Sequence, residues 1–309
     1  MFERMRIAAI VPAFNEADHI GRVIDGMPSE VDAIILIDDA SQDDTASIAE
    51  QSGDPRVSVI RHVKNTGVGG AILDGYVAAL EMGIDVTVVM AGDDQMDPAY
   101  LPALLGPIVS GSAEVTKGNR FFSPESFRGM PRLRIVGNIV LSFLTKAASG
   151  YWHVFDPQNG YVASSAEVLR KIDLSRVARS YAFENDMLVS LNIIGARVRD
   201  VPIPARYGSE TSTLRIGRDG LRILNVLVRG FFRRVFWKYT ISSFSPIALL
   251  LGVGSILCLF GIGFGFWAAV MAVRVVPSAA TVMLAALPFI TGTQMLLFAM
   301  MLDIGEEPK

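Results

Sequence analysis

The sequence reads RIAAIVPAFNE over residues 6–16, DAIILIDDASQDDT over residues 32–45 and VTVVMAGDDQMDP over residues 86–98. In each stretch a short apolar run ends directly in a cluster of polar residues. Apolar runs of this length are typical of buried strands, and segments of helical period separate them. The alternation predicts an α/β fold in which helices cover both faces of a mostly parallel sheet. We expect strands at residues 6–12, 32–38, 56–60 and 86–90 and helices at residues 16–27, 45–51, 68–82 and 98–109.

The polar clusters after these strands are the first candidates for a ligand site. Parallel strands meet at one edge of a sheet by their carboxyl ends, and ligands of such folds bind there. Asp38 and Asp39 end the second expected strand, so we expect them to bind the base or the ribose hydroxyls of a nucleotide. Asp93 and Gln95 offer hard oxygen ligands, which suit Mg²⁺ or Mn²⁺ together with a diphosphate.

The C-terminal part of the chain has a different composition. The chain has 309 residues, of which 51% are hydrophobic and 19% charged, with a mean hydropathy of +0.40. This average is too apolar for an ordinary soluble enzyme. Charged residues are absent from Tyr239 to Val273 and again from Val275 to Leu302. Because a helix crosses a bilayer with about 20 apolar residues, we expect a two-helix transmembrane hairpin here.

A basic amphipathic helix is expected before the spans. At the α-helical repeat Arg218, Arg222, Arg229 and Arg233 fall on one side of residues 218–238, and large apolar residues fall on another. Such a helix is typical of an interface with anionic lipid, with packing on the domain surface as the alternative. We expect a nucleotide-binding domain at residues 1–215, this juxtamembrane helix at 216–240, two spans within 241–303 (about 246–273 and 279–302) and a tail at 304–309.

Charge also bears on location and partners. Lys and Arg cluster in residues 215–238, whereas the connection between the spans carries only Arg274, so we expect the N-terminal domain on the cytoplasmic side of the membrane. The net charge of −3 and the pI near 5.7 argue against a nucleic-acid binder. With Cys258 as its single cysteine, the chain forms no internal disulfide.

Seven motifs occur in an order that resembles one known family. They are VPAFNEADHI (11–20), IDDASQDDT (37–45), HVKNTGVGGAILDGY (62–76), MAGDDQMDP (90–98), KGNRF (117–121), FDPQNGY (155–161) and YAFENDML (181–188). Together they resemble family 2 glycosyltransferases of the GT-A fold, in particular the polyprenyl-phosphate (dolichol-phosphate) sugar synthases. The resemblance covers about residues 6–215, and the paired C-terminal spans are similar to those of membrane-anchored bacterial members.

The resemblance implies a role for each matching position. A nucleotide would be lined by Pro12, Ala13, Asn15, Glu16, Asp38, Asp39 and Asn65. The acceptor phosphate would lie on Arg120, Arg134 and Asn138, and the sugar and diphosphate on Asp156, Gln158, Glu184, Arg206, Ser212 and Arg215. A divalent cation, Mg²⁺ or Mn²⁺, would bind to Asp93 and Gln95, and the catalytic group would be Asp93, Arg120, Arg134 and Asp186.

Two positions depart from the family's pattern. Ala91 stands where the D-x-D-x-Q pattern has its first Asp, which removes one anionic ligand, and Asp94 is the neighbour that could compensate. Val68 stands where many relatives have Lys in an N-x-G-K-G stretch, which removes a cation. The glycines around Val68, from Gly67 to Gly70, are too weak a signal by themselves to predict a phosphate cradle.

The expected activity is transfer of a hexose from a nucleoside diphosphate sugar to polyprenyl phosphate, with inversion, at the cytoplasmic membrane face. We favour a UDP-sugar donor. The alternatives are a mannosyltransferase that uses GDP-mannose and a catalytically inactive nucleotide-sugar-binding partner, which the loss of Asp at position 91 would suit. A processive polysaccharide synthase is disfavoured because the chain lacks a Q-x-x-R-W motif. Glycines in the first span suit close packing between spans or between protomers, so a homo-oligomer is also among the expectations.

Overall fold

The computed structural model describes residues 5–122, 132–204, 216–272 and 276–308, with the backbone alone for residues 132–135 and 216–219. The chain divides into two compact units: Met1–Phe231 with Pro308–Lys309, and Phe232–Glu307. The division falls inside the expected amphipathic helix, not at either of its ends.

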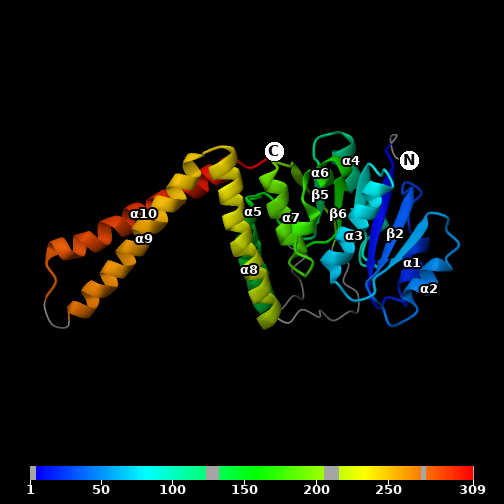
Figure 1. Cartoon of the computed structure of the whole chain (residues 1–309), viewed down its shortest axis with the longest axis horizontal. Coiled ribbons are helices and arrows are strands. Elements are labelled where there is room, and N and C mark those ends of the chain that lie inside the picture. The colour runs from blue at the N-terminus through cyan, green and yellow to red at the C-terminus, as the bar shows by residue number, and fades with distance from the viewer. Residues whose placement is uncertain (1–4, 123–131, 205–215, 273–275, 309) are drawn as a thin grey trace. The chain divides into compact units, whose positions relative to one another are not determined.

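The described residues of the first unit form a seven-stranded sheet (Figure 1). Its strands are β1 (Ile7–Ala13), β2 (Ala33–Asp38), β3 (Val57–Arg61), β4 (Val86–Val89), β5 (Val115–Asn119), β6 (Val162–Ser165) and β7 (Val198–Pro202). They lie in the order β3-β2-β1-β4-β6-β5-β7. β6 is antiparallel to both β4 and β5, and the remaining pairs are parallel. The expected mostly parallel α/β fold is confirmed, and the four strands expected from the sequence are all present.

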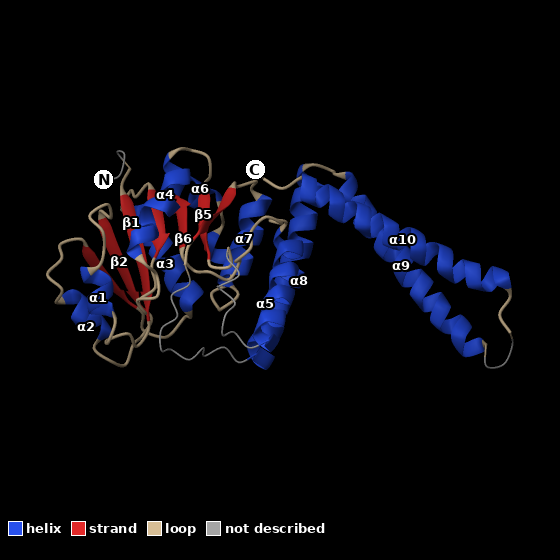
Figure 2. Cartoon of the chain, turned by 180° about the vertical axis from the view of Figure 1, so that it is seen from behind, coloured by secondary structure: helices blue, strands red, loops and turns tan. Residues whose placement is uncertain are grey.

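Helices cover both faces of this sheet (Figure 2). The helices described up to Arg234 are α1 (Ile20–Asp25), α2 (Thr45–Glu50), α3 (Val68–Glu81), α4 (Leu101–Val109), α5 (Arg132–Ser149), α6 (Ala166–Lys171), α7 (Phe183–Ile193) and α8 (Ile216–Arg234), with 3-10 turns at Pro98–Tyr100 and Leu174–Arg176. Alternate residues of each strand face opposite layers, because side chains alternate along a strand. Ile10 of β1 therefore packs in the layer with α3, α6 and α7, and Val11 packs in the layer with α1 and α4.

A further helical layer lies on α7. Val189 of α7 packs with Ala148 of α5 and with Ile223 and Leu227 of α8. Gly230 allows this close approach, since a methyl group there would lie 2.9 Å from a methyl of Val189. The amphipathic helix thus packs on the domain along one stripe, which supports the surface-packing alternative for that stripe.

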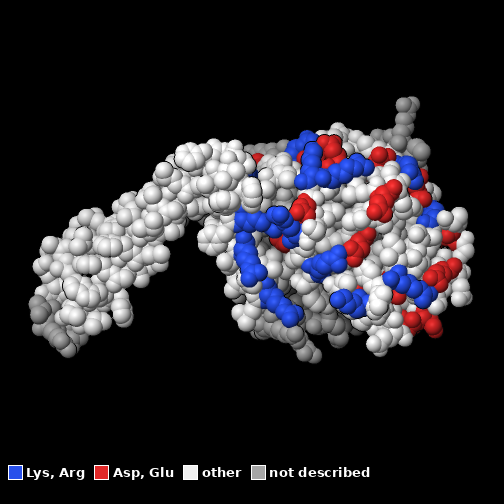
Figure 3. All heavy atoms as spheres, viewed as in Figure 1, with Lys and Arg blue, Asp and Glu red and all other residues white. Residues whose placement is uncertain are grey.

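Other described residues of α8 face outward. Leu221, Leu224 and Val228 are exposed large hydrophobic residues, and Arg222 and Arg229 are exposed as well. Figure 3 shows Lys and Arg side chains gathered along α8. Exposed apolar and basic residues therefore lie beside the packed stripe, because the helix presents different residues on different sides. Contact of this exposed face with lipid stays a prediction.

Two long apolar helices make up most of the second unit. α9 (Pro246–Met271) and α10 (Ala279–Gly305) are long and apolar enough to cross a membrane, and few of their residues are buried. A methyl group on Gly254 would lie 3.0 Å from the carbonyl oxygen of Gly292, and one on Gly261 would lie 2.7 Å from Cβ of Phe289. These glycines allow the two helix backbones to approach closely, as small residues do in membrane proteins.

A buried polar cluster joins the two ends of the second unit. The expected basic helix does not continue as an α-helix to Lys238, because a π-helix follows Arg234, over Val235–Ser242. The Arg234 guanidinium donates to both carboxylate oxygens of Asp303 on α10, at 2.5 and 3.1 Å, and to the Tyr239 hydroxyl at 3.2 Å. The Tyr239 hydroxyl in turn donates to Asp303. All three side chains are buried.

Tyr239→Phe should lower the stability of this unit. The change removes one hydroxyl that satisfies both charged partners, and leaving buried polar groups short of a hydrogen bond costs about 1–2 kcal/mol. We expect a lower thermal unfolding midpoint for the protein in detergent micelles. Ser243→Ala is the matched control, because it removes an exposed hydrogen bond to the Lys238 carbonyl in the same segment and should leave the midpoint within error. Equal midpoints for the two variants would contradict a stabilising role for the cluster.

Candidate active site

Three strand ends are joined at one edge of the sheet. The amide of Asp39, just after β2, donates to the carbonyl of Ala13 at the end of β1, at 2.9 Å. The amide of Gly92, after β4, donates to the Pro12 carbonyl at 3.1 Å. A methyl group on Gly92 would lie 3.1 Å from Cβ of Ala13, so this close approach favours glycine. The polar clusters quoted from the sequence therefore converge, as we expected.

The loop after β1 is fixed to the loop after β2. Asn15 has a positive φ of 57°, a conformation that Asn tolerates better than most residues. Its side-chain oxygen accepts from the Gln42 amide at 2.8 Å, and its own amide donates to the Ser41 hydroxyl at 2.9 Å. The Glu16 amide donates to the Thr45 hydroxyl at 2.8 Å. These bonds hold together the two loops that carry residues predicted to bind a nucleotide.

Asp39 organises a third loop. Its buried carboxylate accepts from the amides of Thr66 and Gly67, each at 2.8 Å, and lies 2.7 Å from Nδ1 of His62. The Asn65 side chain donates to the Asp39 carbonyl at 3.2 Å. Burial alone would raise the pKa of Asp39, but these hydrogen bonds outweigh it and hold the pKa below its ordinary value. The described contacts of Asp39 thus build the loop, and its binding to a base or ribose stays a prediction.

The glycines before and within the first turn of α3 serve packing. A methyl group on Gly67 would lie 2.8 Å from the Arg179 carbonyl oxygen, and one on Gly69 would lie 2.5 Å from Cβ of Phe183. The Gly70 amide donates to the Arg179 carbonyl at 3.0 Å. Residues 178–183 therefore lie directly on this turn, where a phosphate cradle would need open amides. This packing agrees with the weakness of Gly67 to Gly70 as a sequence signal for a phosphate cradle. It also agrees with Val68 at the position where many relatives have a cationic Lys.

Gly69→Ala should destabilise the first unit. The added methyl would overlap Phe183 and approach the Ala178 backbone, and overpacking of this kind costs about 1–3 kcal/mol. We expect a lower thermal unfolding midpoint. Gly106→Ala is the matched control, because a methyl on this α4 glycine meets no described atom within 4 Å and alanine is the better helix former. Gly69→Ala with a midpoint at or above that of the control would overturn the packing role.

An open cavity of about 180 Å³ lies beside the converged strand ends. It is lined by Asp93, Gln95, Met96, Asp97, Tyr100, Arg120, Asn159, Gly160, Tyr161, Ile203 and Pro204. Of the residues predicted from the sequence, it brings together the metal pair and one acceptor arginine. Asp97 was not among the predicted residues, and its carboxylate also caps the following turn by accepting from the Ala99 amide at 3.0 Å.

The loop that carries Asp93 and Gln95 shows how the missing Asp at position 91 is accommodated. The Ala91 amide donates to Sδ of Met96 at 3.2 Å, so a thioether packs beside this position. Asp94 is not among the described residues that line the cavity; its carboxylate lies 3.3 Å from Nε of Arg22, and its φ is +61°. Compensation by Asp94 stays a prediction. Among the described residues no group of three or more His, Cys, Asp or Glu side chains could hold a metal ion.

The remaining donors still fit a divalent cation. Asp93 accepts from the Gln95 amide at 3.1 Å, which fixes the turn between them, and both line the cavity with Asp97. Mg²⁺ in proteins is commonly bound by one or two carboxylates together with substrate phosphates and water, so a cluster of three protein carboxylates is not required. Oxygen donors of this kind suit Mg²⁺ or Mn²⁺ and do not suit softer metals.

Arg120 lines the same cavity in a fixed orientation. Its Nε and Nη2 donate to the two carboxylate oxygens of Asp156, at 2.7 and 3.1 Å, and its amide also donates to Asp156 at 3.2 Å. Asp156 is fully buried, while the Arg120 side chain is 34% exposed. The predicted sugar residue Asp156 therefore orients the predicted phosphate residue Arg120, through a bidentate pair of the strong charge-assisted kind.

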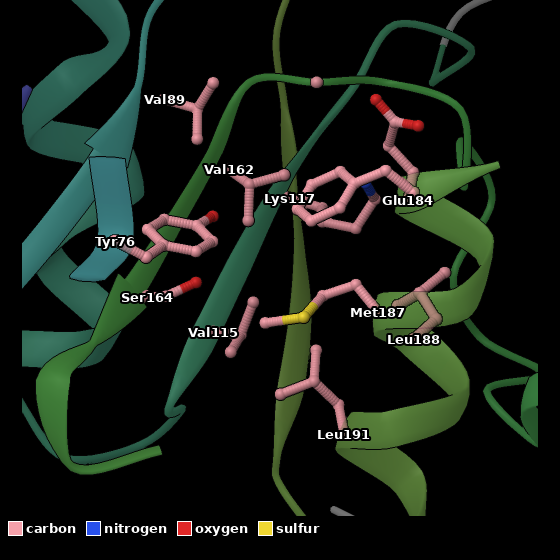
Figure 4. Close-up of a pocket in the computed structure, with 12 residues that line it drawn as sticks. Tyr76, Val89, Val115, Lys117, Val162, Ser164, Glu184, Met187, Leu188 and Leu191 are labelled. Atoms are coloured by element: carbon pink, nitrogen blue, oxygen red, sulfur yellow. The ribbon is translucent and has the colours of Figure 1, made fainter. Parts of the chain in front are cut away.

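A second cavity, of about 20 Å³, shares Gly160 with the first. Figure 4 shows Lys117 and Glu184 at its polar end and Tyr76, Met187 and Leu191 at its apolar end. The Lys117 ammonium donates to the Asn159 carbonyl at 2.6 Å. Burial lowers the pKa of Lys117 and raises the pKa of Glu184, and each charge opposes the shift of the other. Lys117 thus holds the Asp156–Tyr161 loop in place through its bond to the Asn159 carbonyl.

The other predicted residues fall in several places. Asp186 is buried, its carboxylate accepts from the Ala178 amide at 2.8 Å, and it is not among the described residues that line either cavity. Gln158 donates to Asn185 of α7, and Asn138 lies on α5. Arg134 lies on the described backbone of α5, and its side chain lies outside the described residues. Arg206, Ser212 and Arg215 also lie outside the described residues.

Fold and site together define an α/β transferase of the GT-A class. The family model for glycosyl transferase family 2 matches residues 8–173. The chain belongs to this family and is a glycosyltransferase.

Relatives and solved structures agree with this assignment. The chain is 32% identical over 216 residues to the UDP-N-acetylglucosamine–dolichyl-phosphate N-acetylglucosaminyltransferase of Methanococcus voltae, a match that covers 65% of this chain and 86% of the relative. It is 32% identical over 206 residues to the undecaprenyl-phosphate mannosyltransferase of Micrococcus luteus, a match that covers 64% of this chain and 83% of the relative. Its fold is similar to that of glucosyl-3-phosphoglycerate synthase from Mycobacterium tuberculosis in complex with UDP, with a TM-score of 0.59 and 23% sequence identity. This match covers 74% of this chain and 81% of the synthase. The structure of the same synthase with Mn²⁺ and UDP-glucose matches this fold with a TM-score of 0.56 and 23% sequence identity. That match covers 75% of this chain and 80% of the synthase.

Proposed function

We propose that this protein transfers a hexose from a nucleoside diphosphate sugar to polyprenyl phosphate with inversion, giving polyprenyl-phosphate sugar and the nucleoside diphosphate. The observation that carries the proposal is the cavity that joins Asp93 and Gln95 to Arg120 at the carboxyl ends of the strands. Such a cavity offers oxygen ligands for a cation–diphosphate pair beside a guanidinium for a second phosphate. The names of the relatives in Methanococcus and Micrococcus, which act on prenyl phosphates, support the acceptor class.

The acceptor itself simplifies the chemistry. A phosphate monoester has a second pKa near 6, so at neutral pH it carries an oxyanion that attacks without a strong general base. Arg120, oriented by Asp156, would hold this phosphate toward the anomeric carbon of the sugar. As the new C–O bond forms, the bond from the anomeric carbon to the diphosphate breaks, and a single in-line displacement inverts the configuration. A cation on Asp93 and Gln95 would supply Lewis-acid stabilisation of the leaving diphosphate.

Membrane association fits this reaction because the acceptor is a lipid. α9 and α10 would anchor the chain, and the exposed apolar and basic residues of α8 would lie at the interface. The excess of Lys and Arg before the first span supports a cytoplasmic catalytic domain. The domain boundaries given above and a homo-oligomeric state remain part of the proposal.

The sugar and nucleotide are the finer part of the proposal. We favour a UDP-sugar, with GDP-mannose as the alternative, and the names of the relatives include both N-acetylglucosaminyl and mannosyl transferases. An inactive nucleotide-sugar-binding partner is the alternative of a different class, which Ala91 suits because it supplies no ligand.

The test uses the purified full chain with Mg²⁺ or Mn²⁺, polyprenyl phosphate and a panel of UDP- and GDP-sugars. We expect lipid-linked sugar with one donor, detected by mass spectrometry of the extracted lipid. Calorimetry with the same panel separates the alternatives, since nucleotide-sugar binding without turnover would favour the inactive partner. No transfer and no binding with any donor would overturn the proposal.

A further inference from the structure

A buried hydrogen-bonded link joins α5, α7 and the loop that holds Arg120 in place. The Gln158 side-chain amide donates to the Asn185 side-chain oxygen at 2.8 Å, and the Thr145 hydroxyl lies 2.8 Å from the same oxygen. Asn185 is fully buried and Thr145 is 1% exposed. Three segments that are far apart in the sequence thus meet at one amide. Asn185 lies inside the motif YAFENDML, but the sequence analysis gave it no role.

Asn185 lowers the stability of the fold through one buried polar atom. Its Nδ2 has no hydrogen-bond partner among the described residues, although it is buried. An unsatisfied buried donor is unfavourable, and an apolar side chain of similar shape would avoid that penalty. The Thr145 hydroxyl has an alternative partner in the Leu141 carbonyl of its own helix, at 2.8 Å. Stability alone therefore gives little reason for asparagine at position 185.

The link reaches both halves of the proposed site. On α5, positions 134, 138 and 145 fall on one face, because seven and eleven residues are close to two and three whole helical turns. That face carries the two residues of α5 proposed for the acceptor phosphate. Gln158 belongs to the Asp156–Tyr161 loop, whose Asp156 orients Arg120 and whose Asn159 and Gly160 line the open cavity.

We propose that Asn185 is a positioning residue that couples the acceptor-bearing face of α5 to the Asp156–Tyr161 loop, which orients Arg120 and lines the cavity, through Thr145 and Gln158. The inference rests on the proposed function, since that function gives α5 its acceptor. Loss of the link should displace α5 relative to the loop. Small displacements of reacting groups lower catalysis strongly, while the donor surface on the strand ends stays intact.

The kinetic test compares Asn185→Leu, Thr145→Val and Thr145→Ser in the full chain. We expect kcat/KM for polyprenyl phosphate to fall about 10- to 100-fold in the first two variants. Donor affinity by calorimetry should stay within about twofold, and Thr145→Ser, which keeps the hydroxyl, should restore the rate. The thermal midpoint of Asn185→Leu should equal or exceed that of the wild type. A lowered midpoint with donor and acceptor parameters affected equally would reduce the link to a structural role and overturn the proposal.

A second readout does not depend on transfer. Hydrogen exchange of residues 136–149 is followed by mass spectrometry with and without saturating UDP and Mg²⁺, or GDP and Mg²⁺. We expect the nucleotide that binds to slow exchange in this segment of the wild type and not of Asn185→Leu. Absence of that response in the wild type would overturn the coupling. A wild type that responds but transfers no sugar to polyprenyl phosphate would instead overturn the proposed function and leave the coupling supported.

Discussion

Asp93→Ala should lower sugar transfer about a thousandfold, equivalent to about 4 kcal/mol of transition-state stabilisation. Asp93 is the carboxylate of the D-x-D-x-Q position that remains, since Ala91 replaces the first Asp and Asp94 is turned to Arg22. With only Asp93 left as a carboxylate of this pattern, its loss leaves Asp97, which also caps the following turn, as the remaining aspartate of the cavity. We therefore expect the variant to lose Mn²⁺ binding in the presence of the nucleoside diphosphate, measured by electron paramagnetic resonance.

Asp94→Ala is the control for this prediction. It removes an adjacent carboxylate of the same charge, and that carboxylate pairs with Arg22. Because Asp94 and Arg22 form an exposed pair, the change should cost little stability and leave the rate within about twofold of the wild type. Chelation of the metal should inactivate the wild type and be reversed by Mg²⁺ or Mn²⁺. Equal losses in Asp93→Ala and Asp94→Ala would contradict the assignment of Asp93.

Much of the fold could be predicted from hydrophobic pattern alone. The runs that end in Asp38 and at Met90 are short, apolar and bounded by polar residues, and they form β2 and β4. The two uncharged segments after Lys238 form α9 and α10. In these places local sequence and tertiary burial favour the same structure, so the prediction and the structure agree.

The first helix and the basic helix were less accurately predicted. The helix expected from Glu16 begins only at Ile20, because Asn15 has a positive φ and the Glu16 amide is bound by Thr45 at the start of α2. The basic helix changes to a π-helix after Arg234, where a buried Asp303 from a distant segment binds its guanidinium. Both differences come from partners far along the chain, which a local helical period does not reveal.

The residue types of the site could be predicted from the sequence, but the contacts between these residues could not. The motif DPQNGY indicated Asp156 and Gln158, but their partners Arg120 and Asn185 lie 36 and 27 residues away. Asp39 was expected at a nucleotide, and the structure adds that its carboxylate holds the Thr66–Gly67 turn. The sequence does not reveal these backbone partners, and binding of Asp39 to a nucleotide stays a prediction.

The second large effect is expected at the Arg120–Asp156 pair. Arg120→Met should lower transfer about a thousandfold, since the cavity loses the guanidinium proposed for the acceptor phosphate. It should also cost about 3 kcal/mol of stability, because Asp156 is fully buried and would be left unpaired. Stability and rate thus fall together in this single variant, and the rate loss alone does not identify the role of Arg120.

The double variant Arg120→Met/Asp156→Leu separates the two effects. Replacing both partners of a buried pair by apolar residues removes the unpaired charge, so the thermal midpoint should return toward that of the wild type. The rate should remain as low as in Arg120→Met, measured as lipid-linked sugar formed per minute at saturating donor. Asp156→Asn keeps the guanidinium but loosens its orientation, and we expect a loss of about tenfold. Recovery of the rate with the midpoint in the double variant would mean that Arg120 serves only to neutralise Asp156 and that another cation receives the acceptor phosphate.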